Sequence, residues 1–119
     1  MNEECTIYKT ADFIGKRWTI VILLELYRGK SKTKRYSQLK ENIPDITPKI
    51  LSARLKELEK ECLITKKIDV KSIPIKCEYK LTKSGEEFIK IIQHLKTWSL
   101  KWKVNNKVCE HANCKECKI

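Results

Sequence analysis

The chain has 119 residues, a formal net charge of +11 and 41% apolar residues. This is the size of one domain with one core, which argues against a disordered tail protein and against an enzyme with a separate cofactor domain. The longest uninterrupted apolar run, residues 20–24, is far shorter than the roughly 20 residues of a bilayer span. We therefore expect a soluble, cytoplasmic protein without a membrane partner.

The first apolar pattern has helical spacing and covers residues 11–27. Gly15 interrupts it, so we predict a short helix followed by a longer one over about residues 16–27. Gly29 fits the C-terminus of the longer helix, because glycine is the usual residue at that position. Residues 30–35 are then predicted to be a basic loop.

Two more helices, joined by a tight turn, are predicted next. Residues 36–43 have apolar positions three and four apart, and residues 48–61 continue the pattern. Thr47 offers an N-cap hydroxyl and Pro48 suits the first helical position. The expected inner stripe of the second helix is Leu51, Leu55, Leu58 and Cys62. Its outer face is polar with a small residue in the middle, as a helix that approaches base edges requires.

After the predicted helix over residues 48–61, the spacing of the apolar residues changes to the alternation that is typical of β-strands. Residues 63–69 and 77–81 are predicted strands, and a loop with two lysines, residues 70–76, connects them. A strand pair with a basic loop directly after a helix-turn-helix describes a wing. The predicted fold class is therefore α+β, mostly α: a winged helix-turn-helix with a two-stranded wing. Cys62 and Cys77 fall on apolar stripes and are predicted to be small core residues.

The last predicted helix, about residues 84–103, carries one apolar stripe for nearly three heptads. Two tryptophans on a terminal helix exceed what a small core can cover, so we predict a dimerisation helix and a homodimer. The predicted interface residues are Phe88, Ile92, Leu95, Trp98 and Trp102. Residues 1–103 are then the DNA-binding and dimerisation domain, and residues 104–119 are a C-terminal tail.

Nearly all of the excess positive charge lies in the middle of the chain. Residues 28–83 carry sixteen basic and seven acidic side chains, a net charge of +9. A basic surface attracts polyanions, of which nucleic acid is the commonest, although an anionic membrane or a merely solvated lysine-rich surface would also fit. Because this interval contains the helix-turn-helix and the wing, we predict double-stranded DNA as the partner. The predicted contacts are Lys32, Lys34, Arg35, Thr47, Lys49, Ser52, Ala53, Lys56, Lys71 and Lys76.

The tail is rich in metal-ligating residues. Three cysteines and one histidine fall within nine residues: Cys109, His111, Cys114 and Cys117. Thiolates and imidazole suit tetrahedral zinc. The C-x4-C-x2-C spacing also resembles an iron–sulfur run, whose fourth ligand would have to come from elsewhere, such as Cys5. The alternatives are disulfides or an unstructured, reducible tail.

Several sequence blocks together resemble a known family. They are Cys5 and residues 14–19 (IGKRWT), 36–39 (YSQL), 46–59 (ITPKILSARLKELE) and 78–85 (EYKLTKSG). In this order they resemble the HxlR family of winged helix-turn-helix regulators, which are related in architecture to the MarR regulators. The resemblance covers roughly residues 5–102. It implies a dimeric DNA-binding transcriptional regulator with residues 48–61 as recognition helix and residues 70–76 as wing.

The same resemblance implies a redox role for Cys5, because a cysteine at this place is a thiol switch in some members of the family. A helix N-terminus, or the nearby Lys9, Lys16 and Arg17, would favour its thiolate form. A partly buried structural cysteine is the alternative.

Three features depart from the family pattern. The segment between Gly29 and Tyr36 is longer and more basic than usual, and the Cys/His tail lies outside the resemblance. At the wing tip Pro74 stands between two apolar residues, Ile73 and Ile75.

Two other functions are compatible with parts of the sequence. One is a small thiol redox enzyme, and the other is a winged helix that docks RNA or protein. Against the enzyme, the sequence has no glycine-rich phosphate loop, no Cys-x-x-Cys at a strand-to-helix turn, and no histidine with a carboxylate or serine partner at motif spacing. We therefore expect a regulator without catalytic activity.

Overall fold

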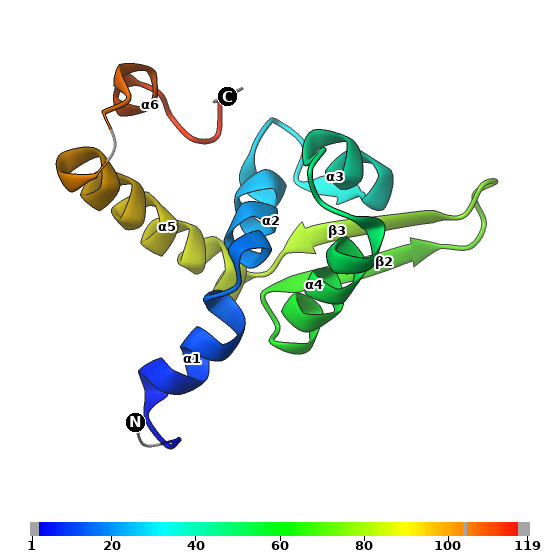
Figure 1. The fold of residues 1–119 in the computed structure, drawn as a ribbon. Helices are drawn as coiled ribbons and strands as arrows, with labels where there is room; N and C mark the ends of the chain where they lie inside the picture. Colours follow the sequence, from blue (N-terminus) through cyan, green and yellow to red (C-terminus); the bar gives the residue numbers. More distant parts are fainter. Residues whose placement is uncertain (1–2, 104, 117–119) are drawn as a thin grey trace.

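The computed structural model describes residues 3–103 and 105–116. In chain order its elements are α1 (Thr6–Ile14), α2 (Arg17–Tyr27), β1 (Thr33–Arg35), α3 (Tyr36–Asn42), α4 (Pro48–Lys60), β2 (Ile64–Asp69), β3 (Lys76–Leu81), α5 (Lys83–Trp102) and α6 (Lys107–His111). Figure 1 shows α2 at the centre, α5 and α6 on one side, and the β2–β3 hairpin extending on the other. The fold is the expected winged helix-turn-helix, mostly α with a small antiparallel sheet.

The sheet has three strands in the order β1-β3-β2. Strands β2 and β3 pair from Ile64↔Leu81 to Asp69↔Lys76, which makes the predicted wing hairpin. The prediction of a loop over residues 30–35 was wrong for its second half, because β1 pairs with β3 at Thr33↔Lys80. The alternation that marks a strand is hidden here, since the inward-facing residue of β1 is a lysine.

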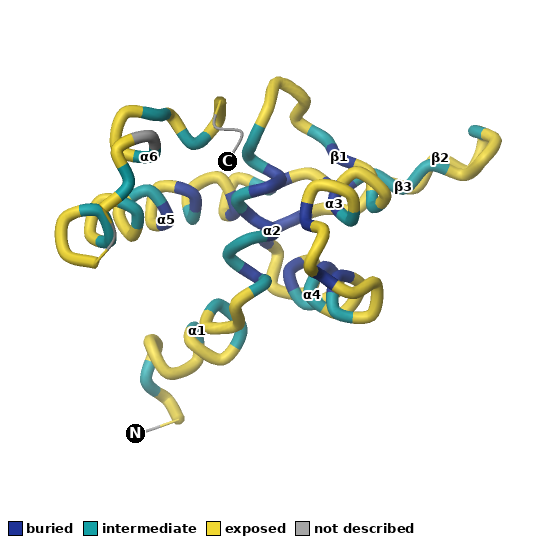
Figure 2. The backbone as a smooth tube through the Cα atoms, turned by 45° about the horizontal axis from the view of Figure 1, so that its top comes forward, coloured by how far each residue is buried: buried dark blue, intermediate teal, exposed yellow. Residues whose placement is uncertain are grey.

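The core surrounds α2. Ile22 and Leu23 of α2 are completely buried, and the predicted inner stripe of α4 packs beside them through Leu51, Leu55 and Leu58. The first half of α5 completes the core with Ile89 and Ile92. In Figure 2 the buried positions gather on α2 and on the parts of α4 and α5 nearest to it, whereas α1 and the far end of the hairpin are largely exposed.

The start of α5 is anchored to the connection between α4 and β2. The Thr82 hydroxyl accepts a hydrogen bond from the Gly85 N–H at 3.1 Å and donates one to the Cys62 carbonyl at 2.6 Å. A Cβ on Gly85 would lie 2.2 Å from the Leu63 carbonyl oxygen, so only glycine permits this approach. Within the described residues, no helix is long and apolar enough to cross a membrane.

The two cysteines that were expected in the core have different environments. Cys77 is half-buried and packs against the core. Cys62 is exposed, which contradicts the prediction, and it has a φ of +64°. It follows the last turn of α4, where the Leu63 N–H donates back to the Leu58 carbonyl at 3.0 Å. A left-handed residue at a helix C-terminus turns the chain sharply, and this turn carries the thiol out of the apolar stripe.

Candidate nucleic-acid interface

Helix α4 presents the polar face that its sequence predicts. Its outer residues are all exposed: Lys49, Ser52, Ala53 and Lys56. Thr47 is the N-cap, and its hydroxyl accepts a hydrogen bond from the Ile50 N–H at 3.2 Å. Pro48 occupies the first helical position. The first-turn N–H groups of α4, together with its exposed lysines, form an electropositive end where a phosphate can bind.

Tyr36, the first apolar position of the predicted helix over residues 36–43, ties α3 to α4 through its hydroxyl. The Tyr36 hydroxyl donates a hydrogen bond to the Pro48 carbonyl at 3.1 Å. The Ser52 hydroxyl in turn donates to the Tyr36 oxygen at 3.3 Å. Tyr36 therefore positions the first turn of α4 and one of its candidate base-reading side chains. The available signal was its phenolic hydroxyl, which a partly buried tyrosine normally pairs.

Lys34 was predicted to contact the DNA backbone, and the structure contradicts this. Its side chain is only 9% exposed. The Nζ atom donates hydrogen bonds to the carbonyls of Glu25 at 2.5 Å, Leu26 at 3.4 Å and Arg28. Lys34 thus caps the C-terminus of α2, where a cation meets unpaired carbonyls and the negative end of the helix dipole. Burial lowers the pKa of this lysine.

The other predicted flanking contacts remain available to a partner. Lys32 and Arg35 are exposed, and Arg35 immediately precedes α3. On the wing, Lys71 is exposed and Lys76 is partly buried. Helix α3 packs against β1 and α4 packs against β2, so these positions belong to the half of the molecule that contains the hairpin (Figure 1).

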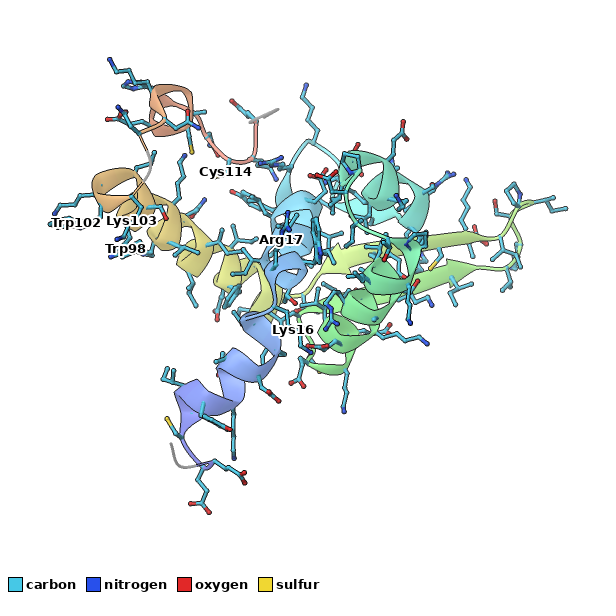
Figure 3. All side chains as sticks on the ribbon, in the orientation of Figure 1. Lys16, Arg17, Trp98, Trp102, Lys103 and Cys114 are labelled. Carbon is cyan, nitrogen blue, oxygen red and sulfur yellow. The ribbon has the colours of Figure 1, made fainter. Side chains whose placement is uncertain are left out.

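The candidate redox residue, Cys5, is half-buried at the N-cap position of α1. Two of the cations expected near it are engaged elsewhere. The Lys16 ammonium lies 2.9 Å from a carboxylate oxygen of Glu57 on α4, and the Arg17 guanidinium stacks over Trp18 at 4.4 Å. Figure 3 places Lys16 where α2 begins, close to α4.

The predicted dimer interface divides into two parts. Phe88 and Ile92 pack against the core of their own domain, and Ile92 is only 6% exposed. Both lie on the half of α5 that packs on α2. The assignment of the buried Ile92 to the interface was therefore wrong, whereas that of the partly buried Phe88 stays a prediction. Past Ile92, α5 leaves the core, and Leu95, Trp98 and Trp102 are exposed, as is Ile91 just before this point. Figure 3 shows Trp98 and Trp102 at the far end of α5.

The tail folds back toward α2. The Gly29 N–H donates to the Lys115 carbonyl at 2.8 Å, and the Lys96 ammonium on α5 donates to the Ala112 carbonyl at 2.7 Å. Cys109 and Cys114 are half-buried and His111 is exposed, whereas Cys117 lies outside the described residues. The part of the tail that is described forms no group of three potential metal ligands. The zinc site therefore stays a prediction.

Comparisons with known proteins identify the family and its architecture. The sequence profile of the HxlR-like helix-turn-helix family matches residues 13–107. The HTH-type transcriptional regulator YdeP of Bacillus subtilis is 35% identical over 117 residues, which are 98% of this chain and 88% of the relative. A MarR-family regulator from Porphyromonas gingivalis superimposes with a TM-score of 0.74 at 32% identity, over 87% of this chain and 97% of that one. Reduced YodB of B. subtilis gives a TM-score of 0.73 at 30% identity, over 86% and 97%. Diamide-treated YodB gives 0.62 at 30% identity, over 85% and 97%.

Proposed function

The chain belongs to the HxlR-like helix-turn-helix family and is a DNA-binding transcriptional regulator, and we propose that it acts as a homodimer on a symmetric duplex site. The observation that carries this proposal is the outer face of α4, which is exposed, basic and free of large apolar side chains. On this proposal the chain regulates in the cytoplasm by binding, without catalysing a reaction.

In the proposed complex each α4 lies in a major groove. Lys49 and Lys56 contact guanine edges or phosphates, Ser52 donates to or accepts from a base edge, and Ala53 permits close approach. Thr47 and the first turn of α4 hold a phosphate. Lys32 and Arg35 contact the flanking backbone, and the wing lysines Lys71 and Lys76 contact the neighbouring groove. Lys34 is removed from the predicted set, because its ammonium is bound to α2.

We propose that the second half of α5 pairs the two subunits. Leu95, Trp98 and Trp102 present a row of large apolar side chains that remain 45%, 52% and 65% exposed. A stripe of this kind on a terminal helix is suited to a second copy of the same helix. Two subunits would then place two α4 helices about one helical turn of DNA apart.

We also propose that oxidation of Cys5 alters DNA binding. The relative YodB superimposes in a reduced form and in a diamide-treated form, and diamide is a thiol oxidant. Cys5 is partly accessible at the start of α1, a helix that leads away from the core in Figure 1. An intersubunit disulfide between two Cys5 thiols, formed when an oxidant such as diamide takes up their two protons and two electrons, would pull on α1 and tilt the two recognition helices. Zinc in the C-terminal tail is a separate proposal, supported by the density of Cys and His there.

The test begins by selecting duplexes from a random library with the reduced protein. The selected duplex is then titrated at about 50 and 200 mM salt. Affinity should fall by about a thousandfold or more if a dimer neutralises six or more phosphates. Lys49→Ala should cost about 1–3 kcal/mol of binding free energy if this lysine reads a base. Lys90→Ala, an exposed charge on α5, is the matched control and should bind as the native protein does.

A flat salt response, or preferential recovery of structured RNA in a parallel selection, would contradict DNA binding through this face. For the redox proposal, diamide should change the affinity of the native protein and leave that of Cys5→Ser unaltered. An equal response of both proteins would place the sensitive thiol elsewhere.

A further inference from the structure

The tip of the β2–β3 hairpin is apolar and almost entirely exposed. Ile73 is 98% exposed, which means that its side chain contacts almost nothing in its own chain. Val70 and Ile75 are also exposed, and Pro74 lies between the two isoleucines. An apolar cluster held in water at the end of a projecting hairpin is unfavourable unless a partner covers it. None of the contacts proposed above uses these side chains.

Positive charges surround this apolar tip. Lys66 and Lys67 on β2 are exposed, as is Lys71 in the loop itself. Asp69 is the only acidic residue between 62 and 77, and it is turned toward its own backbone, because its carboxylate accepts a hydrogen bond from the Lys71 N–H at 3.0 Å. The hairpin therefore carries apolar side chains at its tip and lysines beside them. Charge complementarity favours a polyanion as the partner, and because the chain is a DNA-binding regulator, the bound duplex, whose stacked bases can accept an apolar side chain, is the partner that we argue for.

We propose that Ile73 and Pro74 enter the minor groove of the bound duplex and wedge a base step open, so that the DNA bends. This rests on the proposed DNA-binding function and adds a way of reading DNA that needs no base hydrogen bond. The minor groove, about 6 Å wide, is too narrow for a helix but admits a hairpin tip. Apolar side chains inserted there unstack a base step and kink the duplex. The wing lysines would hold the phosphates on either side.

The wedge makes a prediction about sequence preference. Pyrimidine–purine steps unstack more easily than other steps, so kinking them requires less free energy. Selected duplexes should therefore carry a TA or CA step at the position of each wing, outside the base pairs that α4 contacts. The preference should be read through deformability, because isoleucine and proline side chains have no donor or acceptor for a base edge.

Ile73 is suited to a direct test, because a side chain exposed to this extent does not support the fold. The probe is the selected duplex with a donor and an acceptor dye at its two ends, and energy transfer reports the bend. The native protein should bend it by about 20–90°. Ile73→Ala should straighten the bound duplex and weaken binding about tenfold, whereas Ile73→Leu should retain the bend. 2-Aminopurine at the kinked step should brighten with the native protein and not with Ile73→Ala.

Lys71→Ala separates the wedge from simple charge attraction. It should reduce the salt dependence by about one phosphate contact and leave the bend intact, whereas Ile73→Ala should lose the bend and keep the salt dependence. A native complex with straight DNA, or Ile73→Ala with unchanged bend and affinity, would overturn the wedge while leaving DNA binding in place. A change in oligomeric state with Ile73→Ala would assign the tip to a protein contact and also overturn it. Failure to recover any duplex would overturn the proposed function itself.

Discussion

The Nζ atom of Lys34 lies 2.5 Å from the main-chain oxygen of Glu25, so a strand residue closes the last turn of a helix. The same ammonium reaches the carbonyls of Leu26 and Arg28, which are also in or just after that turn. The Glu25 side chain is buried nearby and accepts a hydrogen bond from Asn42 of α3 at 3.0 Å. One lysine thus joins β1 to α2, beside a carboxylate that joins α2 to α3.

Replacing Lys34 with methionine should destabilise the fold by about 2–3 kcal/mol, because buried carbonyls lose their donor while the apolar length of the side chain is kept. Urea unfolding measures this difference. Lys32→Met, two residues away and exposed, should stay within about 0.5 kcal/mol of the native protein. Equal stability of the two variants would mean that water satisfies the end of α2 as well as Lys34 does.

The stability contributed by Lys34 should also depend on pH. Burial is the main cause that lowers its pKa below the ordinary 10.5; Glu25 opposes this, and Lys115 and Arg28 add to it. The unfolded chain therefore binds this proton more tightly than the folded chain, so stability rises with pH in the window just below 10.5. The unfolding free energy of the native protein minus that of Lys34→Met should therefore increase as the pH rises toward 10.5. Parallel curves for the two proteins would contradict a lowered pKa.

Cys62 offers a substitution that should stabilise the protein. Its φ of +64° is a conformation that glycine adopts freely and that costs other residues about 1 kcal/mol or more. Because the side chain is exposed, Cys62→Gly removes no packing, and we expect a gain of roughly 0.5–1 kcal/mol after the greater freedom of glycine in the unfolded chain is subtracted. Thermal unfolding under reducing conditions measures it. Cys62→Ala keeps the strain, so it is the control and should show no gain.

The helix-turn-helix could be predicted from the sequence because its signals are local. Thr47 and Pro48 mark the start of α4, and the stripe through Leu51, Leu55 and Leu58 sets which face is buried. The outer face follows from the inner one, so the exposure of Lys49 was also predictable. The connection from Tyr36 to Pro48 was missed, because a hydrogen bond across a turn has no periodicity. The exposure of Cys62 was also missed, because the apolar pattern does not show that the chain turns sharply after α4.

The failures at Lys34 and on α5 have a different physical origin, since both depend on long-range contacts. Lys34 belonged to a basic run, and nothing local distinguishes the one lysine of that run that turns inward. The apolar stripe of α5 was read as one surface, but α2 covers only its first half, so Ile92 is buried while Trp98 is 52% exposed. A heptad pattern shows which side chains share a face; it does not show how far the core extends along that face.

The exposed end of α5 gives a direct test of dimerisation. Trp98→Glu places a charge within the row of Leu95, Trp98 and Trp102, and it should shift the protein from dimer to monomer in analytical ultracentrifugation because an unpaired charge cannot be buried cheaply. Helix content should not change, since this part of α5 lies beyond the core. Ile73→Glu, an equally drastic change at the opposite end of the molecule, should remain dimeric. Dissociation of both variants, or of neither, would place the interface elsewhere.

The tail allows the zinc proposal to be decided by metal content. Protein purified without oxygen should carry about one zinc ion per chain if Cys109, His111, Cys114 and Cys117 provide the four ligands of a tetrahedral site. The double variant Cys109→Ser and Cys114→Ser should lose the metal, because serine does not replace a thiolate ligand. A matched double variant, Cys62→Ser and Cys77→Ser, changes two cysteines outside the tail and should keep it. Metal-free native protein would contradict the site, and the tail would then be held to α2 by contacts such as that from the Gly29 N–H to the Lys115 carbonyl.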